Sequence, residues 1–98
     1  MSEKQLRELD AFIAEHVFGF DMAETSVDDI ERYTTDPAAA MLVLEKCCDK
    51  LEGFEITVWR GEKWHCGLRK GNTVHQKADT LPLAICLFAK ELFAKEGK

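Results

Sequence analysis

The stretch Phe54-Glu-Ile-Thr-Val-Trp-Arg-Gly-Glu-Lys-Trp-His-Cys-Gly-Leu-Arg69 decides the fold, because apolar and polar residues alternate on both sides of Gly61. Alternation with a period of two is typical of a half-buried β-strand. The pattern therefore predicts strands over residues 53–60 and 63–69 that pair as a β-hairpin.

Two registers fit this hairpin, and they distribute its apolar residues differently. A two-residue loop that begins with Gly61 suits a type II′ turn and pairs Trp59 with Trp64. Apolar residues then lie on both faces of the sheet, and both faces need cover. A three-residue loop instead pairs Val58 with Cys66 and gathers the apolar residues on one face. Because the turn chemistry is better in the first register, we expect the two-residue loop.

Three helices are predicted around the hairpin, over residues 3–18, 37–51 and 81 to about 95. The first has a single apolar stripe at three- and four-residue spacing, so it should lie at the surface. The other two are apolar nearly all round in their first turns, which predicts packing on more than one side. Asp36 and Thr80 stand where these two helices begin and are residue types that cap helix N-termini.

Shorter elements complete the predicted order. Ser26-Val-Asp-Asp29 resembles a capping box and predicts a short helix at 27–32, and a short third strand is expected at 73–76 with Val74 inward. The fold class is therefore α+β, with a small antiparallel sheet of two to three strands between helices. The expected order is helix, short helix, helix, strand, strand, strand, helix.

Length and charge limit the chain to one small acidic domain. The 98 residues have a net charge of −5 and are 46% hydrophobic, which excludes a disordered chain and predicts a single domain over 1–98. Residues 1–52 hold five basic and thirteen acidic residues, whereas residues 53–77 carry a net charge of +3. An acidic domain is a poor general binder of nucleic acid. No segment has the pattern of a signal peptide or membrane span, so we expect a cytoplasmic protein without membrane contact.

The cysteines and histidines give little support to a catalytic or metal site. Cysteines fall at 47, 48 and 86 in predicted helices and at 66 in a predicted strand, and all four are interpreted as small buried hydrophobic residues. No metal-ligand spacing or nucleophile signature accompanies them, so neither a metal, a cofactor nor an enzyme is predicted. His65 and His75 should lie on neighbouring strands, and adjacent strand residues such as His65 and Cys66 point to opposite faces.

Several segments resemble one known family. Tyr33-Thr-Thr-Asp-Pro-Ala-Ala-Ala40, the strand pattern Trp64-x-Cys66-x-Leu68 and Ala78-Asp-Thr-Leu-Pro-Leu-Ala-Ile-Cys86 together resemble the phage ABA sandwich domain, and Val17, Gly19 and Phe20 resemble its opening. The likeness covers about residues 6 to 93, with Pro37 at a position where an aliphatic residue is expected. It implies a phage or prophage protein of a bacterial host cell, with a sheet between helices. It therefore supports the two-residue loop. The family carries no established activity, so no catalytic residue is implied.

Two groups of residues are candidate sites. One is an interaction surface on the hairpin, made of Trp59, Arg60, Lys63 and Trp64. The other is a cleft at the helix starts, made of Tyr33, Asp36, Asp79 and Thr80. Tryptophan is enriched at binding hot spots, whereas Thr and Asp at a helix start are first of all capping residues.

Three functions follow from these features. The first is a non-catalytic accessory protein that contacts a host or phage protein, or a second copy of itself as a homodimer. The alternative is a weak nucleic-acid binder that uses the basic residues of the hairpin, Arg60, Lys63, Arg69 and Lys70. A second alternative is a small metal- or cysteine-dependent enzyme that uses His65, Cys66 and the cysteines at 47 and 48.

Overall fold

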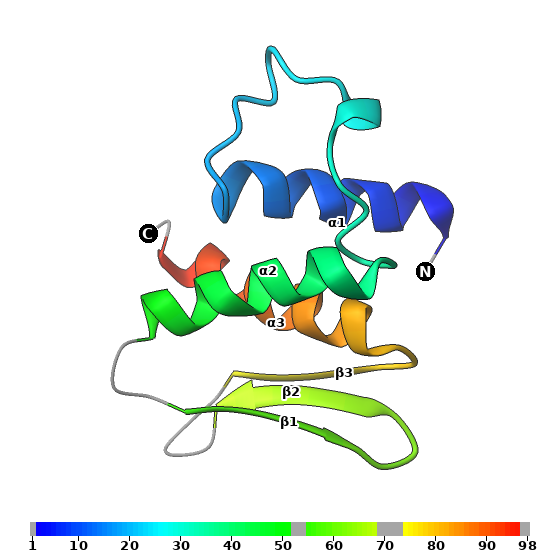
Figure 1. The fold of residues 1–98 in the computed structure, drawn as a ribbon, viewed down its shortest axis with the longest axis vertical. Helices are drawn as coiled ribbons and strands as arrows, with labels where there is room; N and C mark the ends of the chain where they lie inside the picture. Colours follow the sequence, from blue (N-terminus) through cyan, green and yellow to red (C-terminus); the bar gives the residue numbers. More distant parts are fainter. Residues whose placement is uncertain (1, 52–54, 69–73, 97–98) are drawn as a thin grey trace.

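The computed structural model describes residues 2–51, 55–68 and 74–96 (Figure 1). The elements in chain order are α1 (Glu3–His16), a single 3-10 turn (Val27–Asp29), α2 (Pro37–Lys50), β1 (Ile56–Arg60), β2 (Trp64–Leu68), β3 (His75–Ala78) and α3 (Leu81–Glu96). Three helices and a three-stranded antiparallel sheet in this order confirm the α+β class. The predicted hairpin residues 53, 54 and 69 lie outside the described residues.

The helix ends are fixed by local contacts that the sequence predicts. The Asp36 carboxylate accepts a hydrogen bond from the backbone N–H of Ala38 at 3.0 Å, and the Thr80 hydroxyl accepts one from the N–H of Leu83 at 3.4 Å. Gly19 has φ 77°, a left-handed conformation that favours glycine, and it ends the turn that follows α1. These contacts satisfy backbone groups that a helix end leaves without partners.

The hairpin takes the three-residue loop, so the predicted two-residue register is wrong. Val58 pairs with Cys66 and Trp59 pairs with His65, and the loop closes through a 2.9 Å hydrogen bond from the N–H of Gly61 to the carbonyl of Lys63. In this register the apolar residues of the hairpin other than Trp59 gather on the face that meets the helices. Burial of that face outweighs the better turn chemistry of the shorter loop.

The third strand, β3, pairs with β2 over His75–Ala78, and residue 73 of the predicted strand 73–76 lies outside the described residues. Cys66 faces Gln76 and Gly67 faces His75 across this pairing. Val74 is buried, as expected of an inward residue, although it stands just before the strand. The strand order β1-β2-β3 therefore places β2, with Cys66 and Gly67, in the middle of the sheet.

Helix α3 lies at the centre of the molecule. It packs against β2 and β3 on one side and against α1 and α2 on others, which confirms the prediction from its apolar surface. Its fully buried side chains form the middle of the core: Ala84, Ile85, Cys86, Phe88 and Ala89. Figure 1 shows α1 on the far side of α2 and α3 from the sheet. In the described residues the layers are therefore helix, helix pair and sheet, instead of the predicted helix, sheet and helix.

Helix α2 does not meet the expectation of packing all round. It contacts α3 through its buried residues, Ala39, Ala40, Val43 and Cys47. Its opposite side carries Met41 and Leu42, whose side chains are 47% and 50% exposed. The prediction was wrong because α1 packs on α3, and no described element covers the outer side of α2.

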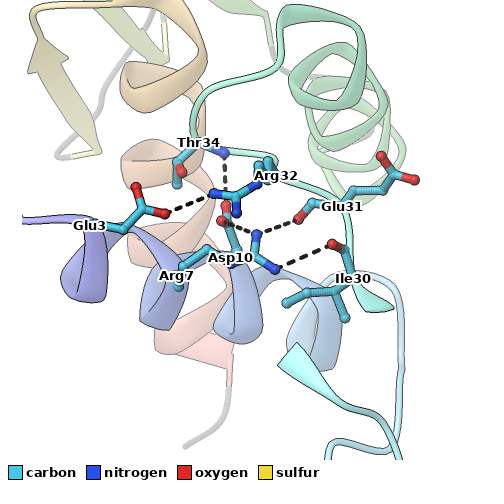
Figure 2. A network of polar contacts seen from close by, with 7 residues as sticks. All are labelled: Glu3, Arg7, Asp10, Ile30, Glu31, Arg32 and Thr34. Carbon is cyan, nitrogen blue, oxygen red and sulfur yellow. Dashed lines mark hydrogen bonds and ion pairs between the residues drawn. The ribbon is translucent and has the colours of Figure 1, made fainter. Parts of the chain in front are cut away.

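A buried carboxylate fastens the long connection between α1 and α2 (Figure 2). Asp10 is 1% exposed and accepts hydrogen bonds from Arg7 Nη1 at 2.7 Å and from the backbone N–H of Thr34 at 2.8 Å. Arg7 also donates to the carbonyl oxygens of Ile30 and Glu31, each at 3.4 Å. The predicted helix at 27–32 is only the 3-10 turn, and these contacts hold the chain that follows it.

Candidate interaction site on the outer face of the sheet

The sheet has an inner face toward α3 and an outer face turned away from the helices. Cys66 is fully buried and Gln76 donates a 2.8 Å hydrogen bond to Glu91 of α3, so both belong to the inner face. Alternate residues point the other way. We define the outer face by the six residues at those positions, Thr57, Trp59, His65, Gly67, His75 and Lys77.

Three aromatic rings form a platform on this face. The imidazoles of His65 and His75 lie side by side, with Nδ1 of His65 2.9 Å from Nε2 of His75 and an angle of 2° between the ring planes. The indole of Trp59 stacks flat over both imidazoles, at centroid distances of 4.8 Å and 5.3 Å. We call these three residues the Trp-His platform. Stacking and the hydrogen bond together fix the orientation of every ring in it.

The strand register builds this platform. It places Trp59 directly opposite His65, and it places His75 diagonally from His65 across the next pairing. Same-face neighbours at these positions are close enough for large side chains to touch. Gly67 faces His75, and a Cβ at Gly67 would lie 3.2 Å from His75 Cδ2. The missing side chain at Gly67 therefore leaves room for the His75 ring.

The predicted interaction surface is divided between the two faces. Trp59 is 43% exposed on the outer face, whereas Trp64 is half-buried against the core and pairs across the strands with Arg60. The Arg60 guanidinium lies 5.6 Å from the centre of the Trp64 ring. The structure thus brings Trp59 together with two histidines and separates it from Trp64. Whether this surface contacts a partner stays a prediction.

Charged side chains lie beside His65 of the platform. Lys63 forms a 2.5 Å ion pair with Asp79, and this contact lowers the pKa of the Asp79 carboxyl. Lys63 and Lys77 also line a shallow depression with His65 and Glu62. Arg69 and Lys70, which were predicted to extend this basic region, lie outside the described residues.

The residues of the predicted cleft at the helix starts have local roles. Tyr33 is only 3% exposed and stacks on Phe18 at a centroid distance of 5.1 Å, and burial raises the pKa of its hydroxyl. Asp36 and Thr80 cap their helices, and Asp79 pairs with Lys63. The two capped ends lie on the same side of the helix pair in Figure 1, and a ligand between them stays a prediction.

The cysteines are free thiols in two kinds of environment. Burial raises the pKa of Cys47 and Cys66 to about 12, and it raises the pKa of Cys86 as well. Cys48 is exposed, which corrects the prediction that all four are buried. The fully buried Cys66 and the outward-facing His65 lie on opposite sides of the sheet, as expected from strand geometry.

Thiol labelling should therefore distinguish one cysteine from the other three. In the folded protein at pH 8, we expect a thiol reagent to modify Cys48 rapidly and the buried cysteines only after denaturant is added, because a thiol reacts as its accessible thiolate. Mass spectrometry of the labelled protein counts the modified sites. In a Cys48→Ser variant the rapid phase should disappear, and rapid labelling of Cys66 would contradict the described burial.

Comparison with known proteins gives one match. A family model described as the phage ABA sandwich domain matches residues 11–89. No curated protein and no solved structure matches the chain. No helix in the described ranges is long and apolar enough to cross a membrane. Because the match covers most of the 98 residues and includes both helix starts and the hairpin, the chain belongs to the phage ABA sandwich domain family.

Proposed function

We propose that this protein is a non-catalytic phage accessory protein that binds another protein through the outer face of its sheet, inside the bacterial host cell. Membership of a phage domain family supports the phage origin. The observation that carries the binding role is the Trp-His platform, in which Trp59 is 43% exposed. No described helix covers this face of the sheet.

The platform has the physical properties of a binding hot spot. Tryptophan is among the residues whose truncation costs most binding free energy in protein interfaces. The indole of Trp59 is already held by stacking on His65 and His75, so little side-chain entropy remains to be lost on binding. Lys77 and the ion pair of Lys63 with Asp79 give the surface a polar rim. A polar rim around a buried aromatic centre is the usual anatomy of an interface.

Replacing Trp59 by alanine should abolish binding of the partner protein. Tagged wild-type protein and its Trp59→Ala variant are recovered from infected host cells, and the proteins that accompany each are quantified. We expect at least one protein to be lost with Trp59→Ala, because truncating a hot-spot tryptophan costs about 2 kcal/mol or more. Phe20→Ala is the matched control, since Phe20 is 41% exposed and belongs to the connection after α1, a segment that Figure 1 shows away from the sheet. Identical captured proteins with and without Trp59 would contradict the proposed surface.

The proposed partner can be a second copy of the protein, and the mass of the protein in solution tests for such a homodimer. Two outer faces can meet across a twofold axis, because such an interface uses the same surface on both copies. Sedimentation of the purified protein over a range of concentrations gives its mass. A dimer that dissociates in Trp59→Ala and persists in Phe20→Ala identifies the second copy as the partner. A monomer at all concentrations leaves a different host or phage protein as the partner.

A further inference from the structure

We propose that His65 and His75 form a two-imidazole binding site for a late divalent transition-metal ion of the Zn²⁺ or Ni²⁺ class, with the indole of Trp59 above it. Imidazole nitrogens are ligands that such ions prefer. The two rings come from neighbouring strands and present Nδ1 of His65 and Nε2 of His75 to each other on the outer face. Metal binding at this pair does not depend on the proposed protein partner.

The separation of the two nitrogens is close to what one metal ion requires. They lie 2.9 Å apart in the structure. Two imidazole nitrogens bound to one tetrahedral ion at the usual bond length lie about 3.3 Å apart. The facing lone pairs point at each other in the structure, because the rings are coplanar and hydrogen-bonded. Binding one ion therefore needs a widening of about 0.4 Å and a tilt of both rings that turns the lone pairs toward a common point.

Metal binding requires both facing nitrogens to be free of protons. His65 must then carry its proton on Nε2 and His75 must carry its proton on Nδ1. In the hydrogen bond between the rings, one facing nitrogen donates and the other accepts. The donor ring therefore loses the proton from its facing nitrogen and gains one from solvent on its other nitrogen. The net charge of the two imidazoles does not change, and the lone pairs of both facing nitrogens go to the metal.

The surroundings position the two rings, and they predict a weak site because moving the rings onto an ion disturbs their stacking on Trp59. Trp59 stacks on both imidazoles, and the missing side chain at Gly67 gives His75 its place. The positive charge of Lys77, opposite His65, opposes a cation. In the described part of the chain, no group of three or more His, Cys, Asp or Glu side chains gathers around a common point. The remaining coordination positions are left for water or for a donor from a bound protein, so the ion should exchange readily.

Titration with Ni²⁺ alone tests the site. The chain has two tryptophans, so a Trp64→Phe background leaves Trp59 as the only indole, and Cys48→Ser removes the exposed thiol. Ni²⁺ is an open-shell ion that quenches indole emission at short range. We expect saturable quenching of Trp59 with one ion per chain by calorimetry. His65→Ala and His75→Ala should each weaken binding by more than about tenfold, since each removes one of two ligands.

Two further variants separate a specific site from general binding. His16→Ala removes the remaining histidine, which lies exposed on α1, and it should leave the titration unchanged. Gly67→Ala keeps both imidazoles but crowds His75, so it should weaken binding while the protein stays folded by circular dichroism. Absence of saturable quenching in the background protein would overturn the proposal, as would a folded His65→Ala or His75→Ala variant that binds Ni²⁺ as tightly as the background protein does. Neither result would bear on capture of a protein through Trp59.

Discussion

Replacing Asp10 by alanine is expected to lower the free energy of unfolding by about 3–5 kcal/mol, the usual cost of removing one partner from a buried ion pair. Asp10 is 1% exposed, and Arg7, its partner at 2.7 Å, is 14% exposed. Alanine leaves this guanidinium in the protein without its carboxylate. It also leaves the backbone N–H of Thr34 without the 2.8 Å acceptor that holds the chain before α2.

Denaturant titration followed by circular dichroism measures this loss, and two variants define its cause. Asp10→Asn keeps an acceptor oxygen for Thr34 but removes the charge opposite Arg7. Its free energy of unfolding should therefore fall by less than that of Asp10→Ala. Arg32→Ala removes the exposed 2.8 Å ion pair with Glu3 in the same region, and it should leave stability unchanged within error. Hydrogen exchange at residues 30–36 should be faster in Asp10→Ala. A loss below about 1 kcal/mol in Asp10→Ala would mean that the Asp10 contacts do not stabilise the fold.

The parts of the fold that depend on neighbouring residues could be predicted from the sequence. Capping by Asp36, the turn at Gly19 and the hairpin around Gly61 each depend on a few consecutive residues. The apolar surface of α3 predicted that it packs on more than one side, for the same reason. Helix ends were predicted within about two residues, which is the usual uncertainty of helix boundaries.

Features that depend on distant residues could not be predicted. Turn chemistry favoured one hairpin register and burial of apolar residues favoured the other. The described helices all lie on one side of the sheet (Figure 1), so the register that buries the apolar residues on that face is the more stable one. Asp10 and Thr34 are 24 residues apart, and the residue type of Asp10 does not distinguish it from the exposed acidic residues of α1. Its place on the face of α1 that carries Leu9 and Ile13 is the one signal that could have identified it.

The candidate site was predicted in part, for the same physical reason. Trp59 was expected to contribute to an exposed surface, and His65 and His75 were expected on neighbouring strands. Only the observed register places Trp59 opposite His65 and so joins the three rings into one platform. An error of one residue in register moves every side chain of a strand to the other face. In the wrong register, Trp64 is therefore the cross-strand neighbour of Trp59.

Replacing Phe88 by alanine is expected to lower the free energy of unfolding by about 3–5 kcal/mol through the cavity that it leaves. Phe88 is one of the largest fully buried side chains, and it lies on the helix that contacts both the sheet and the other two helices. Domains of this size have a total stability of only about 5–15 kcal/mol, so the variant should melt at a much lower temperature.

Phe20→Ala is the matched control for this core substitution, because it removes the same side chain from a position that is 41% exposed. We expect its stability to stay within about 0.5 kcal/mol of the wild-type value. Phe88→Leu fills most of the cavity and should lose less stability than Phe88→Ala. Because α3 contacts α1, α2 and the sheet, Phe88→Ala should shift the denaturation midpoints of helix and sheet signals together. Similar losses for Phe20→Ala and Phe88→Ala would show that α3 is not the centre of the core.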